Sequence, residues 1–189
     1  MKLYFIRHGQ TDWNNEGKIQ GSRDTELNEI GLNQAVELSN KVLDSNLKFS
    51  RIYSSKQKRA LKTAEILGSY TNVECIPTDG LEEVNLGVWE GLSWKEVRDT
   101  YPKEYEEWYH NRRYSGAHKG ESYQDMIDRV LKALRGIIAD NKDNVVIVTH
   151  SAVIKCLLCY ITNTPFENMQ VFKTENAGIT EIDSSDLMS

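Results

Sequence analysis

The sequence predicts an α/β fold, a three-layer sandwich in which helices cover both faces of a mainly parallel central sheet. Short runs rich in β-branched and aromatic residues alternate with amphipathic stretches about 10 to 18 residues long. Because parallel strands need long crossover connections, this alternation places helices on both faces of the sheet. The chain contains no internal repeat, low-complexity tract or linker, so residues 1–189 are expected to form a single domain.

The expected strands are short apolar runs bounded by polar or turn-forming residues. The first covers Lys2–Arg7 and leads into a long polar loop over Gly9–Glu26. Further strands are expected at Ser50–Tyr53, Val73–Pro77 and Asn144–Thr149, with a pair of edge strands at Met169–Lys173 and Ile179–Ile182.

The expected helices are identified by apolar residues at helical spacing and by capping residues at their starts. Asn28 is expected to cap the first helix, which runs to about Ser45. The pair Ser54-Ser55 is expected to cap the second, which continues through Leu67. The remaining helices are expected over Ser93 to about Arg112 with a break at Pro102, over Ser122–Ala139, and over Ser151–Ile161.

Composition and charge exclude several classes of protein. The chain has 39% hydrophobic residues and a formal net charge of −5, so it lacks the basic excess expected for binding nucleic acid or an anionic membrane. The apolar start, Leu3–Ile6, is too short for a secretory signal or a membrane helix. Three cysteines without disulfide spacing suit a reducing compartment, so we expect a cytoplasmic protein. Cys156 and Cys159 lie in an apolar helical stretch that fits the core better than a redox loop.

Two of the expected strands end in a histidine, His8 and His150. In an open parallel sheet, ligands bind beyond the carboxyl ends of the strands. If the two strands are neighbours, both imidazoles and the guanidinium of Arg7 meet in one pocket. Arginine is suited to binding phosphate, and a neutral imidazole can attack phosphorus and carry the phosphoryl group. The pattern therefore predicts a phosphate site in which His8 is the candidate nucleophile.

Five separated segments, in this order, resemble the motifs of one protein family. They are Arg7 to Asn14, Leu27 to Gly31 with Gln34-Ala35, Ser54-Ser55 through Thr63-Ala64, Leu81 to Gly91, and Val148 to His150; two shorter matches are Gly120-Glu121-Ser122 and Asn176-Ala177. On these residues the chain resembles the phosphatase branch of the histidine phosphatase superfamily, which includes phosphoglycerate mutases. The resemblance implies a phosphoglycerate mutase-like fold and metal-independent catalysis through phosphohistidine, so we expect neither a metal nor a cofactor.

The resemblance also assigns roles to charged residues. It implies that Arg59 binds phosphate together with Arg7. It places the proton donor second after a leucine, which selects Glu83 and leaves Glu82 as the alternative. His150 stands at the mouth of its helix, where the helix dipole and the imidazole can stabilise developing negative charge.

Three polar residues are expected to complete the phosphate site. Asn14 and Gln20 lie in the loop after the first strand and can supply neutral donors. Ser151 stands where the family usually has glycine, so its hydroxyl either bonds the phosphate, caps the helix or narrows the pocket.

An aromatic-rich helical insertion is expected at about residues 89–120. One interpretation makes it a lid that covers the active site, with Trp89, Trp108, Arg112 and Arg113 reading the leaving group of the substrate. The other has its aromatic residues packing on the domain while its charges remain solvated. The sequence does not decide between them.

The function expected from these residues is hydrolysis of a small phosphorylated metabolite. The alternative is a phosphoglycerate mutase-type transfer, which uses the same central residues but excludes water. The resemblance implies that mutases of this type are longer than this chain of 189 residues, so hydrolysis is favoured. A phospho-ligand binding module without catalysis is a third interpretation, but binding alone would not need Glu83. The sequence indicates neither the physiological substrate nor the oligomeric state.

Overall fold

The computed structural model describes residues 1–45 and 47–187, and these contain a five-stranded sheet with the strand order β3-β2-β4-β1-β5. The strands are β1 (Lys2–Arg7), β2 (Arg51–Ser54), β3 (Cys75–Pro77), β4 (Val145–Thr149) and β5 (Ile179–Asp183). The first four are parallel, and β5 pairs antiparallel with β1 at the edge. The predicted mainly parallel sheet is confirmed.

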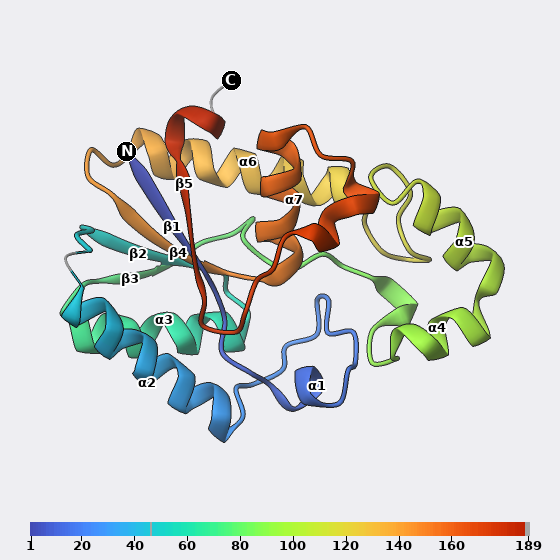
Figure 1. Cartoon of the computed structure of the whole chain (residues 1–189), viewed down its shortest axis with the longest axis horizontal. Helices are drawn as coiled ribbons and strands as arrows, with labels where there is room; N and C mark the ends of the chain where they lie inside the picture. The colour runs from blue at the N-terminus through green and yellow to red at the C-terminus, as the bar shows by residue number, and fades with distance from the viewer. Residues whose placement is uncertain (46, 188–189) are drawn as a thin grey trace.

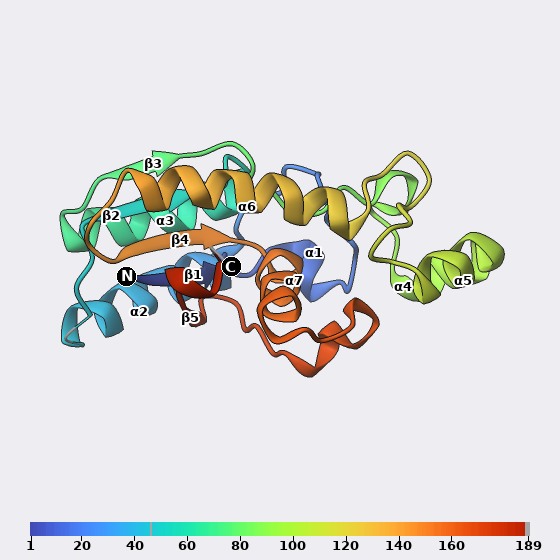
Figure 2. The same ribbon diagram turned by 90° about the horizontal axis from the view of Figure 1, so that it is seen from above.

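Helices cover both faces of this sheet (Figure 1, Figure 2). One face packs against α2 (Glu29–Asp44) and α3 (Lys58–Thr71), and the other against α6 (Tyr123–Ala139) and α7 (Ser151–Thr162). Side chains of a strand alternate between its faces, so Tyr4 and Ile6 of β1 join the first core while Leu3 and Phe5 join the second. This confirms the three-layer architecture.

The predicted helix starts at Asn28, Ser93, Ser122 and Ser151 are correct, and the one at Ser54-Ser55 is wrong. The side chain of Asn28 accepts a hydrogen bond at the start of α2, and Ser122 forms a capping box at the start of α6. By contrast, α3 begins at Lys58, and its N-cap residue Gln57 makes no side-chain capping bond. Ser54-Ser55 does not cap α3. Ser54 ends β2, and the hydroxyl of Ser55 bonds a histidine of the site described below and the backbone nitrogen of Gln57, which precedes the helix. The backbone nitrogen of Lys58, the first residue of α3, donates to Asp24 instead.

The C-terminal region departs from the predicted pair of edge strands. Only β5 joins the sheet, whereas Met169–Lys173 falls largely within the 3₁₀ helix η2 (Phe166–Val171). Met169 is buried in the core with Phe166, and the backbone nitrogen of Phe172 donates to the carbonyl of Met169. Because this hydrogen bond joins residues three apart, it closes a turn, and the segment does not pair with the sheet as a strand. A further 3₁₀ helix, η3 (Ser184–Leu187), follows β5.

The remaining short helices lie in the connections. The loop after β1 contains α1 (Asp12–Asn15), and the segment after β3 contains η1 (Gly87–Trp89), α4 (Trp94–Thr100) and α5 (Pro102–His110). The break predicted at Pro102 is therefore confirmed, although the second helix ends at His110. In both views α4 and α5 lie at one end of the molecule, beyond the sheet (Figure 1, Figure 2).

Candidate active site

The two histidines lie side by side, with their ring planes tilted by 58°, at the carboxyl ends of neighbouring strands. In the register of β1 and β4, Arg7 is opposite Thr149, so His8 and His150 follow at the same edge of the sheet. Their ring centroids are 5.2 Å apart, and both side chains are buried. The parallel pairing of the two strands thus brings the predicted residues together.

Hydrogen bonding fixes the tautomer of His8. Its Nδ1 lies 2.7 Å from the carbonyl oxygen of Gly9, which can only accept, so Nδ1 carries the proton. Nε2 therefore keeps its lone pair. Burial holds the pKa of His8 well below its usual value of 6.5, and the charges of Arg59 and Arg7 lower it further. The imidazole is consequently neutral, as a nucleophile must be.

His150 is oriented by a serine at the end of a third strand. Its Nε2 lies 2.9 Å from the hydroxyl of Ser55, which follows β2. Burial again lowers the pKa well below 6.5, with Arg59 and His8 adding to the shift. The buried Nδ1 of His150 has no hydrogen-bond partner among the described residues. Such an atom is suited to bonding a substrate oxygen.

Two arginines supply positive charge beside His8. Arg7 donates from Nη1 to the carbonyl of Thr174 at 2.8 Å. Arg59, which is fully buried, donates from Nη1 to Arg23 O at 2.6 Å and from Nη2 to Gly21 O at 2.9 Å. Burial lowers the pKa of Arg59 to about 10, so the group stays charged at neutral pH. Both arginines keep a buried Nε without a partner in the described chain, and these donors can bind phosphate oxygens.

The structure separates the two candidate acids. The carboxylate of Glu83 accepts from the backbone nitrogens of Ala152 at 3.2 Å and of Val84 at 3.0 Å, and it lines the same cavity as His8. Burial raises its pKa above the usual 4.5, against the opposing effects of these bonds and of the two arginines. Glu82 instead accepts from the backbone nitrogen of Gly80 at 2.8 Å and does not line the cavity.

The predicted neutral residues lie around the cavity, which has a volume of about 300 Å³. Asn14 accepts from the backbone nitrogen of Thr11 through Oδ1, and Gln20 accepts from the Thr11 hydroxyl. The hydroxyl of Ser151 pairs with that of Thr174 at 2.6 Å. The other lining residues include Lys18, Ile19, Gly21, Val84, Leu86, Trp94, Tyr123, Lys155, Met169 and Gln170.

The tryptophans expected in a lid pack against each other instead. Trp89 and Trp108 are buried, with their rings edge to face at a centroid distance of 5.3 Å. Neither lines the cavity. Trp94 does, and its ring stacks on Trp108 at 5.4 Å while remaining 36% exposed. The segment therefore contributes one aromatic ring to the cavity rim.

Arg112 and Arg113, the two arginines assigned to a possible lid, also lie outside the cavity. Arg112 is buried, with its guanidinium 5.0 Å from the ring centroid of Trp108. Arg113 lies over Phe166 and donates to Gln124 at 2.9 Å. Cation–π contacts, of Arg112 with Trp108 and of Arg113 with Phe166 of η2, thus hold these charges outside the cavity. Lys18 and Lys155 are the additional cations that do line the cavity.

Several residues at the candidate site were not predicted from the sequence. Gln57 accepts from the backbone nitrogen of Glu83 at 2.8 Å and donates to Gly21 O at 3.0 Å. Ser55 follows a strand next to β4, so the rule that ligands bind at strand ends could have identified it. Lys155 lies four residues after Ser151 on α7, a spacing that puts both on one helix face.

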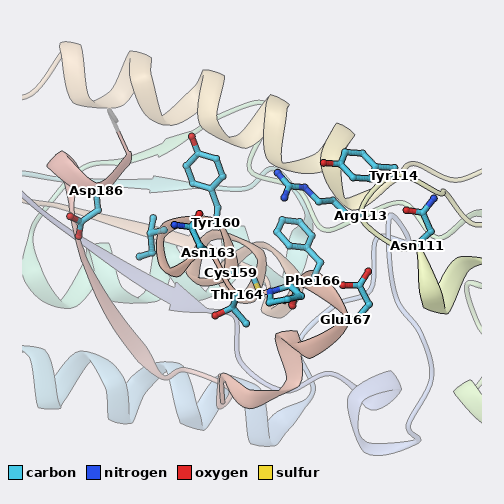
Figure 3. Close-up of a pocket in the computed structure, with 12 residues that line it drawn as sticks. Asn111, Arg113, Tyr114, Cys159, Tyr160, Asn163, Thr164, Phe166, Glu167 and Asp186 are labelled. Carbon is cyan, nitrogen blue, oxygen red and sulfur yellow. Dashed lines mark hydrogen bonds between the residues drawn. The ribbon is translucent and has the colours of Figure 1, made fainter.

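A larger cavity, of about 580 Å³, lies elsewhere (Figure 3). Figure 3 shows Arg113, Tyr114, Tyr160 and Phe166 around it, near the C-terminal end of α7. It contains none of the predicted nucleophile, acid or phosphate-binding residues. The smaller cavity is therefore the candidate active site.

Residues 1–45 and 47–187 contain no group of three or more His, Cys, Asp or Glu side chains placed to hold a metal ion. None of the helices described has the length and apolar character needed to cross a membrane.

Comparison with known proteins places this site in a family. The chain is 35% identical over 171 residues to rat 6-phosphofructo-2-kinase/fructose-2,6-bisphosphatase 3, covering 90% of this chain but only 29% of that protein. It is 30% identical to a putative phosphoserine phosphatase 2 of Hydrogenobacter thermophilus, covering 96% and 88% of the two chains. A mycobacterial glucosyl-3-phosphoglycerate phosphatase solved with VO3 superposes with a TM-score of 0.84 at 29% identity, covering 96% and 90%. Residues 3–186 match the sequence profile of the histidine phosphatase superfamily (branch 1), and the chain therefore belongs to that family.

Proposed function

We propose that this chain is a metal-independent phosphomonoesterase that hydrolyses a small phosphorylated metabolite through a phosphohistidine on His8. The observation that carries the proposal is the neutral His8, whose Nε2 keeps its lone pair, in one cavity with Arg7, Arg59 and the carboxyl of Glu83. The phosphoserine phosphatase and glucosyl-3-phosphoglycerate phosphatase among the relatives support this class of substrate.

In the first step, Nε2 of His8 attacks phosphorus, a P–N bond forms, and the P–O bond to the leaving group breaks. Protonated Glu83 gives its proton to the departing oxygen, and its raised pKa favours that form. Arg7, Arg59 and His150 stabilise the negative charge on the phosphoryl oxygens with donors that are already in place. Asn14, Gln20 and Ser151 complete the wall around the phosphate.

In the second step, the Glu83 carboxylate takes a proton from water as the water oxygen attacks phosphorus. The P–N bond breaks, inorganic phosphate leaves, and His8 returns to its neutral form. One carboxyl group therefore serves as acid and then as base, and the cycle restores its protonation state.

Two other functions are disfavoured. A mutase would return the phosphoryl group to a second oxygen of the substrate and must exclude water, but Trp89, Trp108, Arg112 and Arg113 do not close over the cavity. A binding module without catalysis would have no need to bury a carboxyl group. Burying Glu83 has a free-energy cost that its two backbone bonds only partly offset.

We place residues 1–189 in one histidine phosphatase domain whose insertion at 89–120 contributes Trp94 to the rim. Three free cysteines support a cytoplasmic location. The net charge of −5 supports a small metabolite as the partner, in preference to nucleic acid or a membrane.

The test is a screen of phosphorylated metabolites that measures released phosphate, with 3-phosphoglycerate plus 2,3-bisphosphoglycerate as the mutase arm. Substrate labelled in its phosphate should leave label on the protein that is stable in base and lost in acid, as expected for phosphohistidine. His8→Ala should abolish both signals, while the control His110→Ala, at an exposed residue of α5, should retain them. Isomerisation without phosphate release would refute the proposal.

A further inference from the structure

One arginine outside the cavity has every donor of its guanidinium engaged. Arg129 lies on α6 and donates from Nη1 to Gly80 O at 3.1 Å and to Glu82 O at 2.8 Å. Its Nη2 donates to Glu83 O at 3.0 Å. Three carbonyls in four consecutive residues are thus bound by one planar side chain, on the loop that carries Glu83.

Glu121 uses the remaining donors. Its Oε2 accepts from Nε of Arg129 at 3.1 Å, and its Oε1 accepts from Nη2 at 2.6 Å and from the backbone nitrogen of Asn85 at 2.8 Å. This two-bond contact fixes the plane of the guanidinium. The preceding Gly120 lets the two segments approach, because a Cβ there would lie 2.4 Å from Asn85 O. The motif Gly120-Glu121 therefore has a structural role: Gly120 permits the close approach, and Glu121 orients Arg129.

The acid itself has no regular backbone support. Glu83 lies outside the helices and strands, and its backbone nitrogen donates to Gln57 while its carbonyl accepts from Arg129. Both backbone groups are therefore held by side chains rather than by a sheet ladder. The position of the carboxyl group relative to Ala152 and the cavity depends on these two side chains.

We propose that Arg129, oriented by Glu121, is a positioning residue for the proton donor Glu83. The inference rests on the proposed function, in which Glu83 protonates the leaving group. Arg129 does not line the cavity, so its contact with the site runs through the 80–83 loop. Its charge also lowers the pKa of His150, an effect that acts alike on all phosphomonoesters and so leaves the ratio between two substrates unchanged. Its removal should impair proton donation much more than phosphate binding or attack by His8.

The leaving group of the substrate distinguishes these effects. A p-nitrophenolate leaves without a proton, whereas a phenolate is more basic and needs one, and the two aryl phosphates have nearly the same shape. We expect Arg129→Met to lower kcat/KM for phenyl phosphate at least tenfold more than for p-nitrophenyl phosphate. Arg129→Lys should show the same selective loss, because an ammonium cannot reach all the acceptors of the planar group. Arg135→Met, at an exposed position of the same helix, is the control and should change neither value.

The outcomes separate this inference from the function on which it rests. Glu83→Gln should show the selective loss in full; if it does not, the acid role of Glu83 fails and the inference fails with it. If Glu83→Gln shows the loss and the Arg129 variants lower both substrates equally or neither, only the positioning role is refuted. If Arg129→Met does not fold, Glu121→Gln and Arg129→Lys are judged by the same ratio.

Discussion

The carboxylate oxygen Oε2 of Glu83 lies 3.2 Å from the backbone nitrogen of Ala152, the second residue of α7. The first N–H groups of a helix have no partner within the helix, so this bond uses a donor that α7 cannot satisfy itself. It places the acid beside His150, the residue that precedes α7. The N-terminus of α7 therefore positions both the proposed acid, Glu83, and His150, the imidazole proposed to bind phosphate.

Replacing this acid with its amide should separate chemistry from binding. Glu83→Gln keeps an oxygen that can accept from Ala152 but cannot give or take the proton. We expect turnover to fall at least about 100-fold, in the range of general acid–base catalysis, while the affinity for inorganic phosphate changes little. Steady-state kinetics and phosphate inhibition would measure the two effects. Near-normal turnover would contradict the assignment.

The value of kcat/KM should fall at both low and high pH, and burial shifts the pKa that governs each of these limbs. The attack requires neutral His8, so activity falls at low pH as that imidazole is protonated; burial lowers its pKa, so this limb lies below 6.5. Proton donation requires protonated Glu83, so activity falls at high pH as that carboxyl ionises; burial raises its pKa, so this limb lies above 4.5. In Glu83→Gln the high-pH limb should disappear. An acid limb above 6.5 would show that the environment does not act on His8 as described.

The hydroxyl of Ser55 should matter because it is the partner of His150. Ser55→Ala removes the bond at Nε2 of His150 and leaves a buried imidazole free to turn; it also removes the longer bond, 3.3 Å, that the Ser55 hydroxyl accepts from the backbone nitrogen of Gln57. The loss of one hydrogen bond to a buried polar group costs about 1–3 kcal/mol, so we expect kcat/KM to fall by roughly 5- to 100-fold. Ser69→Ala is the matched control, since Ser69 is exposed on α3 and its hydroxyl bonds only within that helix. Equal activity in the two variants would exclude this role.

Lys155 should select substrates that carry a second negative charge. Its ammonium lines the cavity and donates to Gln170 at 2.7 Å, while burial and, secondarily, Arg7 lower its pKa. An anionic group on the leaving alcohol would offset the repulsion between the positive charges of Lys155 and Arg7. Lys155→Met should therefore raise KM for phosphorylated carboxylates about tenfold and leave KM for phenyl phosphate nearly unchanged.

The control for this variant is Lys132→Met, at an exposed position on α6. An equal rise in KM for charged and neutral leaving groups would mean that Lys155 only shapes the cavity.

The sequence predicted the features of the site that depend on strand order. His8 and His150 could be paired because each ends a β-branched run and because such runs form neighbouring parallel strands. Glu83 could be preferred over Glu82 by its place in a motif, although both lie in an irregular segment where strand alternation does not apply. Local patterns were sufficient for the two histidines, because each is positioned by the strand that it follows.

The features that could not be predicted depend on contacts between distant segments. Arg112 and Arg113 have the charge expected of substrate ligands, but Trp108 and the distant Phe166 hold them elsewhere. Met169 has the apolar flanks of a strand residue, yet it turns into the core because β5 already occupies the edge beside β1. Arg129 looks like an ordinary helix arginine until its carbonyl acceptors are known.

Ser151 marks the departure from the family's usual glycine, and its contacts indicate what it does. Its hydroxyl pairs with Thr174 at 2.6 Å, and the carbonyl of Thr174 accepts from Arg7 at 2.8 Å. Ser151 thus contacts the residue that positions Arg7, which we propose binds phosphate. We expect Ser151→Gly to raise KM for phosphomonoesters about 3- to 10-fold, as for loss of one hydrogen bond, with a smaller change in kcat.

Thr174→Val separates this contact from the effect of glycine on α7. It removes the same hydroxyl pair but leaves the helix start unchanged, so it should raise KM to a similar extent. If Ser151→Gly raises KM and Thr174→Val does not, the cause is the loosened helix start, because glycine at that position adds backbone freedom near Glu83 and His150. If neither variant changes KM, the hydroxyl pair does not support Arg7, and the position of that guanidinium must depend on β1 alone.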